Sequence, residues 1–345
     1  MSLSMRFHDF EIWDGTAFSR GDVWVEDGKV QAIGEVNERA EFEFEGNGGL
    51  LTAGMVDIHT HLRYLSDDRY GLPPEAATYP FGVTAAADAT GMRGDASYIK
   101  KIEPKTCVWV EIPIRDNRPD FAVAAARAAG FGEYAVGYKV YFSKGMGAKD
   151  ASPLAEIFRW ADRPVMVHVT GSPVPMAEYL PLFRKGDVLT HAFHGGEHTA
   201  AQDGFAALRL AQERGVVIDL GMAGHAHTDL EILGQAAALG LFPDTVSTDA
   251  VIGSLNRRGG RYGLTLCMSV MQTLGMPRAA LMAAVTTRAA QVLGRPWGRL
   301  TVGGAADLAV LDVDKTGGFA YPGLAAEQGL TCWLTLRDGV VVHRR

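Results

Sequence analysis

The stretch MVDIHTH at residues 55–61 opens the pattern that decides the fold. It is short, its apolar residues are Met55, Val56 and Ile58, and it ends in His-Thr-His. Short apolar runs of this kind are typical of buried strands in a parallel sheet. Seven comparable runs follow, at 83–90, 106–114, 134–143, 164–171, 188–195, 216–223 and 245–251. The sequence therefore predicts eight strands in the middle of the chain.

Helical stretches separate most of these predicted strands. Examples are FAVAAARAAG at 121–130, SPLAEIFRWA at 152–161 and AALRLAQERG at 206–215. Eight strands that alternate with helices are typical of a (β/α)8 TIM barrel, so we expect an α/β fold with a distorted barrel over residues 53–299. The alternative is an open doubly wound sheet, but no G-x-G-x-x-G motif follows the first strand, which disfavours a dinucleotide-binding fold.

The two ends of the chain differ from the middle. Residues 5–50 and 300–345 contain short β-rich runs broken by Asp-Gly pairs, such as Asp27-Gly28 and Asp338-Gly339. An Asp-Gly pair between apolar runs is a strong short-range signal of a β-hairpin. We therefore predict one small β-sandwich-like domain built from residues 1–52 and 300–345 together.

The composition is that of a globular protein with a large core. Hydrophobic residues make up 47% and charged residues 21% of the chain, and the net charge of −7 disfavours a nucleic-acid partner. No run of 18 apolar residues and no secretory signal is recognisable, so we expect a cytoplasmic protein without a membrane partner. Cys107, Cys267 and Cys332 lie in apolar segments, which favours buried thiols. The expected partner is a small-molecule substrate, and the sequence is compatible with a homo-oligomer.

Residues that can bind metal ions lie toward the ends of the predicted strands. His59 and His61 end the first strand, and side chains two residues apart in a strand point to the same face. A bare His-x-His occurs often by chance, but four further residues lie in separate strands: Lys139, His168, His191 and Asp249. Each one alone could be a hydrogen-bonded core residue. Because a TIM barrel has its active site at the C-terminal strand ends, the six together predict a metal site.

These six residues resemble the metal-binding pattern of the amidohydrolase superfamily. The resemblance spans nearly the whole chain and includes VDIHTHLR at 56–63 and GRLTVGGAADLAVLD at 298–312, which is similar to a closing segment common in that superfamily. Within it, VLTHAFHG at 188–195, DTVSTD at 244–249 and GVTAAADA at 82–89 most resemble the dihydroorotase-like group of predicted deacetylases and amidohydrolases.

The resemblance implies a centre with two divalent metal ions. Lys139 would be an N6-carboxylysine whose carbamate bridges the ions, His59, His61 and Asp249 would bind one ion, and His168 and His191 the other. A carbamate would turn a costly buried cation into an anionic oxygen donor. The two ions would activate a bridging hydroxide, and Asp249 would act as the general acid–base. Zinc suits these ligands, though manganese, iron or cobalt would also fit.

Three arginines are candidates for substrate binding. In dihydroorotases, the arginine two residues after the second metal-binding histidine contacts the substrate carboxylate, and Arg63 has that position here. Its alternative is a surface arginine in a loop with Asp67 and Asp68. Arg257 and Arg258, with Arg261 nearby, lie in a glycine-rich loop after Asp249, where they would attract an anionic substrate or remain solvated. The loop histidines, whose roles are open between contacting substrate and orienting a ligand, are His194, His198, His225 and His227.

The function we expect is metal-dependent hydrolysis of an amide or ester bond in a small carboxylate-bearing molecule, with release of an N-acyl or O-acyl group. A dihydroorotase-like hydrolase of cyclic amides is the first alternative. The chain departs from true dihydroorotases, however, because it has DATG at 88–91 where they have Met-Pro-Asn-Thr, and AVIG at 250–253 where they have His-Ala-Pro-His.

Two further alternatives are weaker. One-metal deaminases of the same superfamily usually lack the bridging lysine and carry a glutamate shortly after a metal-binding histidine. Here His168 is followed by Val-Thr-Gly-Ser and His191 by Ala-Phe-His-Gly. A scaffold that has lost its metals would have lost ligands, yet all six ligand positions are intact.

Overall fold

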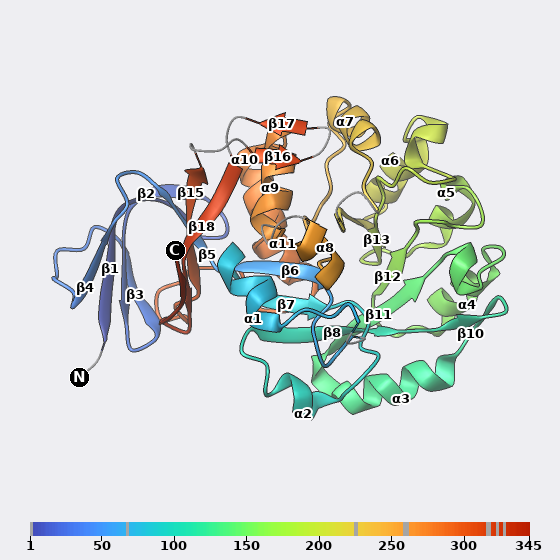
Figure 1. The fold of residues 1–345 in the computed structure, drawn as a ribbon, viewed down its shortest axis with the longest axis horizontal. Coiled ribbons are helices and arrows are strands. Elements are labelled where there is room, and N and C mark those ends of the chain that lie inside the picture. Colours follow the sequence, from blue (N-terminus) through green and yellow to red (C-terminus); the bar gives the residue numbers. More distant parts are fainter. Residues whose placement is uncertain are drawn as a thin grey trace. The chain divides into compact units, whose positions relative to one another are not determined.

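The computed structural model describes residues 3–66, 69–223, 227–257, 262–314, 319–321, 324–326 and 329–345. The chain divides into two compact units (Figure 1). The first unit consists of Met1–Asp57, Pro74–Ala86 and Gly263–Arg345, and the second of Ile58–Pro73 and Ala87–Tyr262. Among the helices described, none is long and apolar enough to span a membrane.

The first unit contains an eight-stranded sheet built from both ends of the chain. Its order is β19-β18-β15-β5-β1-β2-β3, and β4 pairs with β1. The strands are β1 (Ser4–Trp13), β2 (Phe18–Glu26), β3 (Lys29–Gly34), β4 (Phe42–Glu45), β5 (Leu50–Ala53), β15 (Leu308–Asp314), β18 (Gly329–Arg337) and β19 (Val340–Arg344). Strands from the two ends meet where β5 pairs antiparallel with β15.

Two Asp-Gly hairpins connect strands in this sheet. In the turn from β2 to β3, Asp27 and Gly28 have φ angles of 52° and 75°, and between β18 and β19 Asp338 and Gly339 have 49° and 75°. Positive φ at both central residues matches the right-handed twist of the flanking strands. Both Asp-Gly pairs therefore form the hairpin turns that the sequence predicted.

One face of the sheet forms an apolar core. The aromatic rings of Phe7 and Phe44 stack at 4.8 Å, in a buried cluster that also contains Ile12, Val23 and Leu334. The helices of this unit are α1 (Pro74–Thr78), α9 (Leu264–Thr273), α10 (Arg278–Ala284) and α11 (Thr287–Val292). A separate two-stranded sheet forms where β16 (Phe319–Tyr321) pairs with β17 (Leu324–Ala326). Helix α9 packs against β18.

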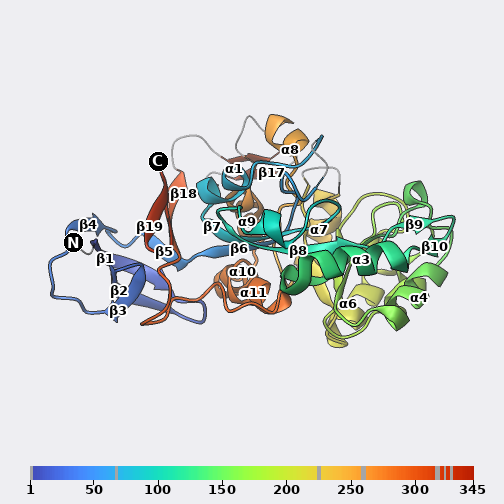
Figure 2. The same ribbon diagram turned by 90° about the horizontal axis from the view of Figure 1, so that it is seen from below.

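A curled, seven-stranded parallel sheet runs through the middle of the chain (Figures 1 and 2). Its order is β14-β13-β12-β11-β8-β7-β6, so strands that are consecutive along the sequence lie side by side, apart from the short hairpin of β9 (Ile114–Arg115) and β10 (Arg118–Pro119). The strands are β6 (Met55–Thr60), β7 (Val83–Asp88), β8 (Lys105–Glu111), β11 (Ala135–Tyr141), β12 (Val165–His168), β13 (Val188–Thr190) and β14 (Val217–Asp219). The expected α/β fold is confirmed.

Helices connect the parallel strands of the second unit. They are α2 (Ala96–Ile99), α3 (Phe121–Phe131), α4 (Ser152–Trp160), α5 (Met176–Tyr179), α6 (Ala206–Glu213), α7 (Leu230–Ala238) and α8 (Ile252–Arg257). The side chain of Asp120 caps α3 by accepting a hydrogen bond from the Val123 backbone N–H at 3.1 Å. The helix then packs its buried face against β8 and β11 (Figures 1 and 2).

The segment predicted as the eighth strand, 245–251, is not a regular strand. It forms two isolated parallel bridges, Asp219 with Thr245 on one side and Thr60 with Ala250 on the other. Between them, Asp249 has a φ of 48°, which interrupts the extended conformation. Its backbone N–H still donates to the carbonyl of His59 at 2.7 Å. An irregular segment thus takes the place of the expected strand and is hydrogen-bonded beside both β14 and β6.

Candidate functional site

The six side chains predicted as metal ligands come together in the second unit. They are His59 in β6, His61 directly after it, Lys139 in β11, His168 at the end of β12, His191 directly after β13, and Asp249 in the irregular segment. The strands are parallel, so their C-terminal ends lie at one edge of the sheet, where the segment carrying Asp249 joins them. This is the arrangement expected from the positions of the six residues toward the C-terminal ends of parallel strands.

The Asp249 carboxylate lies between two groups of imidazoles. Its Oδ1 is 2.8 Å from Nε2 of His61 and 3.3 Å from Nε2 of His59, while its Oδ2 is 3.7 Å from Nε2 of His191 and 4.0 Å from Nε2 of His227. Burial alone would raise the pKa of Asp249, but His59 and His61 hold it well below its usual range. The carboxylate is therefore ionised and available as a donor to both groups.

A buried hydroxyl and carboxylate determine the orientation of His59. Thr190 Oγ1 donates to Asp219 Oδ2 at 2.8 Å, so its oxygen accepts from Nδ1–H of His59 at 3.0 Å. Asp219 also accepts hydrogen bonds from Thr245 and Ser247, each at 2.8 Å. A proton on Nδ1 leaves the lone pair of His59 on Nε2, which faces the site.

His61 has an equivalent support from different residues. Ser66 Oγ lies 3.2 Å from Nδ1 of His61 and donates to Asp88 Oδ2 at 2.8 Å. The other Asp88 oxygen accepts from the backbone N–H groups of Thr90 and Gly91, at 3.0 and 2.8 Å. The lone pair of His61 is thereby also directed to Nε2. The sequence analysis missed these supporting residues, and the only signal was a polar residue at the end of a buried strand.

Lys139 is completely buried. Its Nζ lies 3.0 Å from Nε2 of His59 and 3.5 Å from Met166 Sδ. Burial lowers the pKa of Lys139 to about 8, against an opposing effect of the carboxylates of Asp249, Asp219 and Asp88. The amine is therefore much closer to deprotonation at neutral pH than an ordinary lysine.

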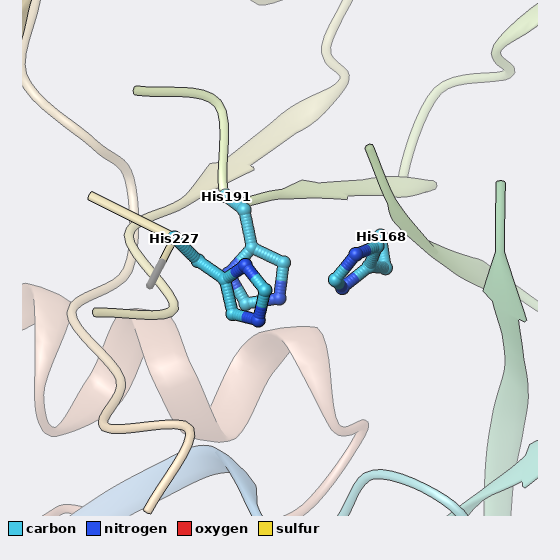
Figure 3. Close-up of side chains that lie close together, drawn as sticks. All are labelled: His168, His191 and His227. Atoms are coloured by element: carbon cyan, nitrogen blue, oxygen red, sulfur yellow. The ribbon is translucent and has the colours of Figure 1, made fainter. Parts of the chain in front are cut away.

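Three histidines form a second group of ligand atoms in the described residues (Figure 3). His168 and His191 were predicted here, and His227, from the loop after β14, joins them. One ring nitrogen from each lies within 4.8 Å of the others. His191 Nδ1 donates to the Gly221 carbonyl at 2.7 Å, which leaves its lone pair on Nε2. Burial lowers the pKa of both His168 and His191 well below the usual range, so both are neutral, the form that binds metals.

The hydrogen-bond pattern of this site fits a metal ion. Nε2 of His61 lies 2.8 Å and Nε2 of His59 3.3 Å from Oδ1 of the Asp249 carboxylate. Ligand atoms about 2.0–2.1 Å from a tetrahedral zinc ion are separated by roughly 3.4 Å, so the spacing suits an ion. Nε2 of His191 points the same way, because it is buried without a hydrogen-bond partner among the described residues.

The structure describes only some of the arginines predicted to bind substrate. Arg63 lies in the turn directly after His61, half-buried, and its backbone N–H donates to the Leu72 carbonyl at 2.6 Å. Arg257 is the last residue of α8, which begins three residues after Asp249, but its side chain lies outside the described residues. The other two arginines of this loop lie outside the described residues, as do the two aspartates near Arg63 and one loop histidine. These residues are Arg258, Arg261, Asp67, Asp68 and His225.

Two of the four loop histidines differ clearly in their surroundings. His194 is buried, its Nδ1 accepts from the Gly196 backbone N–H at 3.2 Å, and burial lowers its pKa to about 4. His227 contacts the rings of His168 and His191. The signal that could have singled out His227 is the sequence His225-Ala226-His227, which repeats the His-x-His spacing of the first strand.

Comparison with known proteins relates the chain to a known fold. No family model matches it. A deacetylase of Brucella anthropi is 27% identical over 317 residues, covering 83% of this chain and 78% of that protein, and a deacetylase of Agrobacterium fabrum is 27% identical over 330 residues, covering 87% and 80%. The crystal structure of a dihydroorotase superimposes with a TM-score of 0.86 at 22% identity, covering 99% of this chain and 98% of that one. The chain has the same fold as this dihydroorotase.

A second solved structure shares this fold. An adenine deaminase superimposes with a TM-score of 0.83 at 20% identity, covering 98% of this chain and 99% of that one. The resemblance inferred from the sequence is confirmed. The names of these proteins are those of hydrolytic enzymes that act on carbon–nitrogen bonds, which agrees with the expected hydrolytic enzyme. Because the amidohydrolase fold carries several reactions, the reaction has to be argued from the site.

Proposed function

We propose that this protein is a metal-dependent amidohydrolase that removes an acyl group from nitrogen or oxygen in a small carboxylate-bearing molecule. The observation that carries the proposal is the position of Asp249, between two groups of imidazoles whose lone pairs face it. Relatives named deacetylase, which match most of this chain, favour release of an acyl group over other hydrolytic reactions.

The residues divide into two sets of donors. His59, His61 and Asp249 would hold one divalent ion, His168 and His191 the other, and Lys139, as N6-carboxylysine, would bridge them. A neutral amine adds to CO2 to give a carbamate and a proton, and the pKa of about 8 for Lys139 makes the neutral form accessible. Zinc fits the imidazole and carboxylate donors best. When bound, the ions would lower the pKa of a water molecule and polarise the substrate carbonyl.

The protein's own groups would orient the substrate and move the proton. Asp249, ionised in the structure, would take a proton from the attacking water at a carboxylate oxygen and deliver it to the nitrogen or oxygen of the leaving group. Arg63 would bind the substrate carboxylate through its planar guanidinium. Arg257 and Arg258 are second candidates for that contact, because they follow Asp249 closely in the sequence.

The end of β7 argues against a dihydroorotase reaction. Asp88 and Thr90, in the DATG segment, are engaged beneath His61, since Asp88 accepts from Ser66 and Thr90 donates to Asp88. These side chains support a ligand instead of facing a substrate. A hydrolase of cyclic amides is therefore the second candidate, favoured only by Arg63 and by the similarity of the fold to a dihydroorotase.

We also propose how the fold is divided. The parallel sheet would be part of a distorted (β/α)8 barrel over residues 53–299, with 245–251 in the position of the eighth strand. The backbone hydrogen bonds from this segment to β14 and β6 support that assignment. Residues 1–52 and 300–345 would form the small β-sandwich-like domain, as the pairing of β5 with β15 suggests.

The experiment that tests the function combines metal analysis with a substrate panel. Protein produced with added zinc or manganese should contain about two ions per chain, and purified enzyme should be assayed on N-acyl amino acids, acyl esters of hydroxy acids and cyclic amides. Lys139→Ala should lose most of the activity and one ion, and short carboxylic acids should partly restore both by replacing the carbamate. Lys144→Ala is the matched control, because Lys144 is exposed and paired with Glu197. Full activity and full metal content in Lys139→Ala would disprove the bridging role.

A further inference from the structure

We infer that His227 is a third imidazole ligand of the metal ion held by His168 and His191. The inference rests on the proposed two-metal function. It adds a ligand that is not among the six residues predicted from the strand ends. The three imidazoles come from three separate segments, the ends of β12 and β13 and the loop after β14, and their rings face a common space (Figure 3).

The geometry of the three rings suits coordination of one ion. Ring centroids are 4.6 Å apart for His168 and His191, 4.8 Å for His168 and His227, and 4.4 Å for His191 and His227. One nitrogen of each ring lies within 4.8 Å of the others. Zinc binds imidazole nitrogen at about 2.0–2.1 Å, which places tetrahedral ligands roughly 3.4 Å apart, so the nitrogens need to approach by no more than about 1.4 Å. Small torsions of the side chains supply such a movement.

The hydrogen bonds leave these nitrogens free to bind. His168 Nε2 lies 3.2 Å from the Thr170 carbonyl and His191 Nδ1 lies 2.7 Å from the Gly221 carbonyl, so each ring presents its other nitrogen as an acceptor. Nδ1 of His227 is buried and has no hydrogen-bond partner among the described residues, and its Nε2 is 4.0 Å from Asp249 Oδ2, too far for a hydrogen bond. A histidine that served only the packing of the core would be expected to satisfy such an atom.

The side-chain donors are also divided unevenly between the two ions. His191 has a single free nitrogen, and it belongs both to the three-histidine group and to a group with His59 and Asp249. One nitrogen binds one ion. If His191 is committed to the ion of His168, that ion has only two side-chain donors, whereas the other ion has His59, His61 and Asp249. With His227, each ion has three, and the carbamate of Lys139 would complete four for both.

The loop that carries His227 is anchored close to the site. The Asp229 backbone N–H donates to the Phe193 carbonyl at 2.9 Å, which ties this loop to the one that follows His191. Asp229 also caps α7, since its side chain accepts from the Glu231 backbone N–H at 2.8 Å. Before the loop, the Ala223 backbone N–H donates to the Thr248 carbonyl at 2.9 Å. These contacts restrict where the imidazole can go, as a metal ligand requires.

The experiment replaces His227 and reads the metal directly. In His227→Gln, the affinity for the zinc ion at His168 and His191, measured by competition with a chelator, should fall about tenfold or more, because loss of a supporting residue alone costs that much. The affinity for the other ion, at His59 and His61, should stay within about twofold of the wild-type value. His198→Gln is the matched control, since His198 is a loop histidine that belongs to neither group of ligand atoms in the described residues.

A cysteine variant gives a positive signature. His227→Cys keeps a side chain that binds zinc and cobalt, so the protein loaded with Co2+ should retain two ions and show a new thiolate-to-cobalt charge-transfer absorption that the wild-type protein lacks. Two ions bound at wild-type affinity in His227→Gln, or no such absorption in His227→Cys with two cobalt ions bound, would overturn the inference alone. A wild-type protein that binds fewer than two ions would overturn the proposed function itself, and this inference with it.

Discussion

Replacing Thr190 by valine tests whether the support beneath His59 controls metal binding. Valine keeps the branched shape of the side chain but removes the hydroxyl that joins His59 Nδ1 to Asp219, through contacts of 3.0 and 2.8 Å. Asp219 retains its hydrogen bonds from Thr245 and Ser247. Nδ1 of His59, in the buried interior, therefore loses its hydrogen bond to the hydroxyl and keeps the longer approach to Asp219 Oδ2, at 3.5 Å.

Two separate effects follow from this loss. Loss of a buried hydrogen bond costs about 0.5–1.5 kcal/mol, so the free energy of unfolding of the metal-free protein should fall by that amount. In addition, the His59 ring is no longer held in one tautomer and orientation. Loss of such a support typically weakens metal affinity about 10- to 100-fold, or roughly 1.4–2.7 kcal/mol of binding free energy.

Urea unfolding of the metal-free protein and zinc titration against a chelator measure the two effects separately. Thr190→Ser is the control, because it keeps the hydroxyl and loses only a methyl group. Its zinc affinity should stay close to that of the wild-type protein. If Thr190→Val and the wild type bind zinc equally while Thr190→Val is less stable, the hydroxyl is purely structural and the reasoning on His59 is refuted.

Two further substitutions test the proposed catalytic and substrate contacts. Asp249→Asn should keep much of the metal but slow kcat by a factor of about 10² to 10⁴, the usual size of a general acid–base contribution, and metal content measured beside kcat separates the two roles. An unchanged rate would leave Asp249 as a ligand only. Arg63→Met should raise KM more than it lowers kcat. The loss of binding free energy should be about 1.5–3 kcal/mol for a free-acid substrate and less for its methyl ester. Equal losses on acid and ester would show that Arg63 does not contact the carboxylate.

The strands could be predicted from the sequence wherever their backbone stays extended. Apolar runs located all seven strands of the parallel sheet, because a strand buried on both faces consists almost entirely of apolar residues. The predictions ran too long at 188–195 and failed at 245–251. In both places the interruption is a proposed ligand with positive φ, 64° at His191 and 48° at Asp249. Residue type does not reveal such a conformation, which is more common at functional sites.

The candidate site could likewise be predicted from the sequence only in part. Side chains at strand ends could be brought together from the sequence alone, because parallel strands end at one edge of the sheet. His227 could not be placed, since it lies in a loop whose position depends on contacts such as that of Asp229 with Phe193. The hydroxyl and carboxylate supports were equally hidden, because Ser66 and Asp88 are distant in sequence and meet only when the chain folds.

The contact between His61 and Asp249 joins residues that are 188 positions apart. Ribosomes add about 5–20 residues per second, so roughly 10–40 seconds separate the synthesis of these two residues. During that time the nascent chain carries His59 and His61 without the carboxylate of their proposed ligand set, and without the backbone partner that Asp249 gives to the His59 carbonyl. The proposed ligand set would therefore be complete only late in synthesis, after most of the chain has been made.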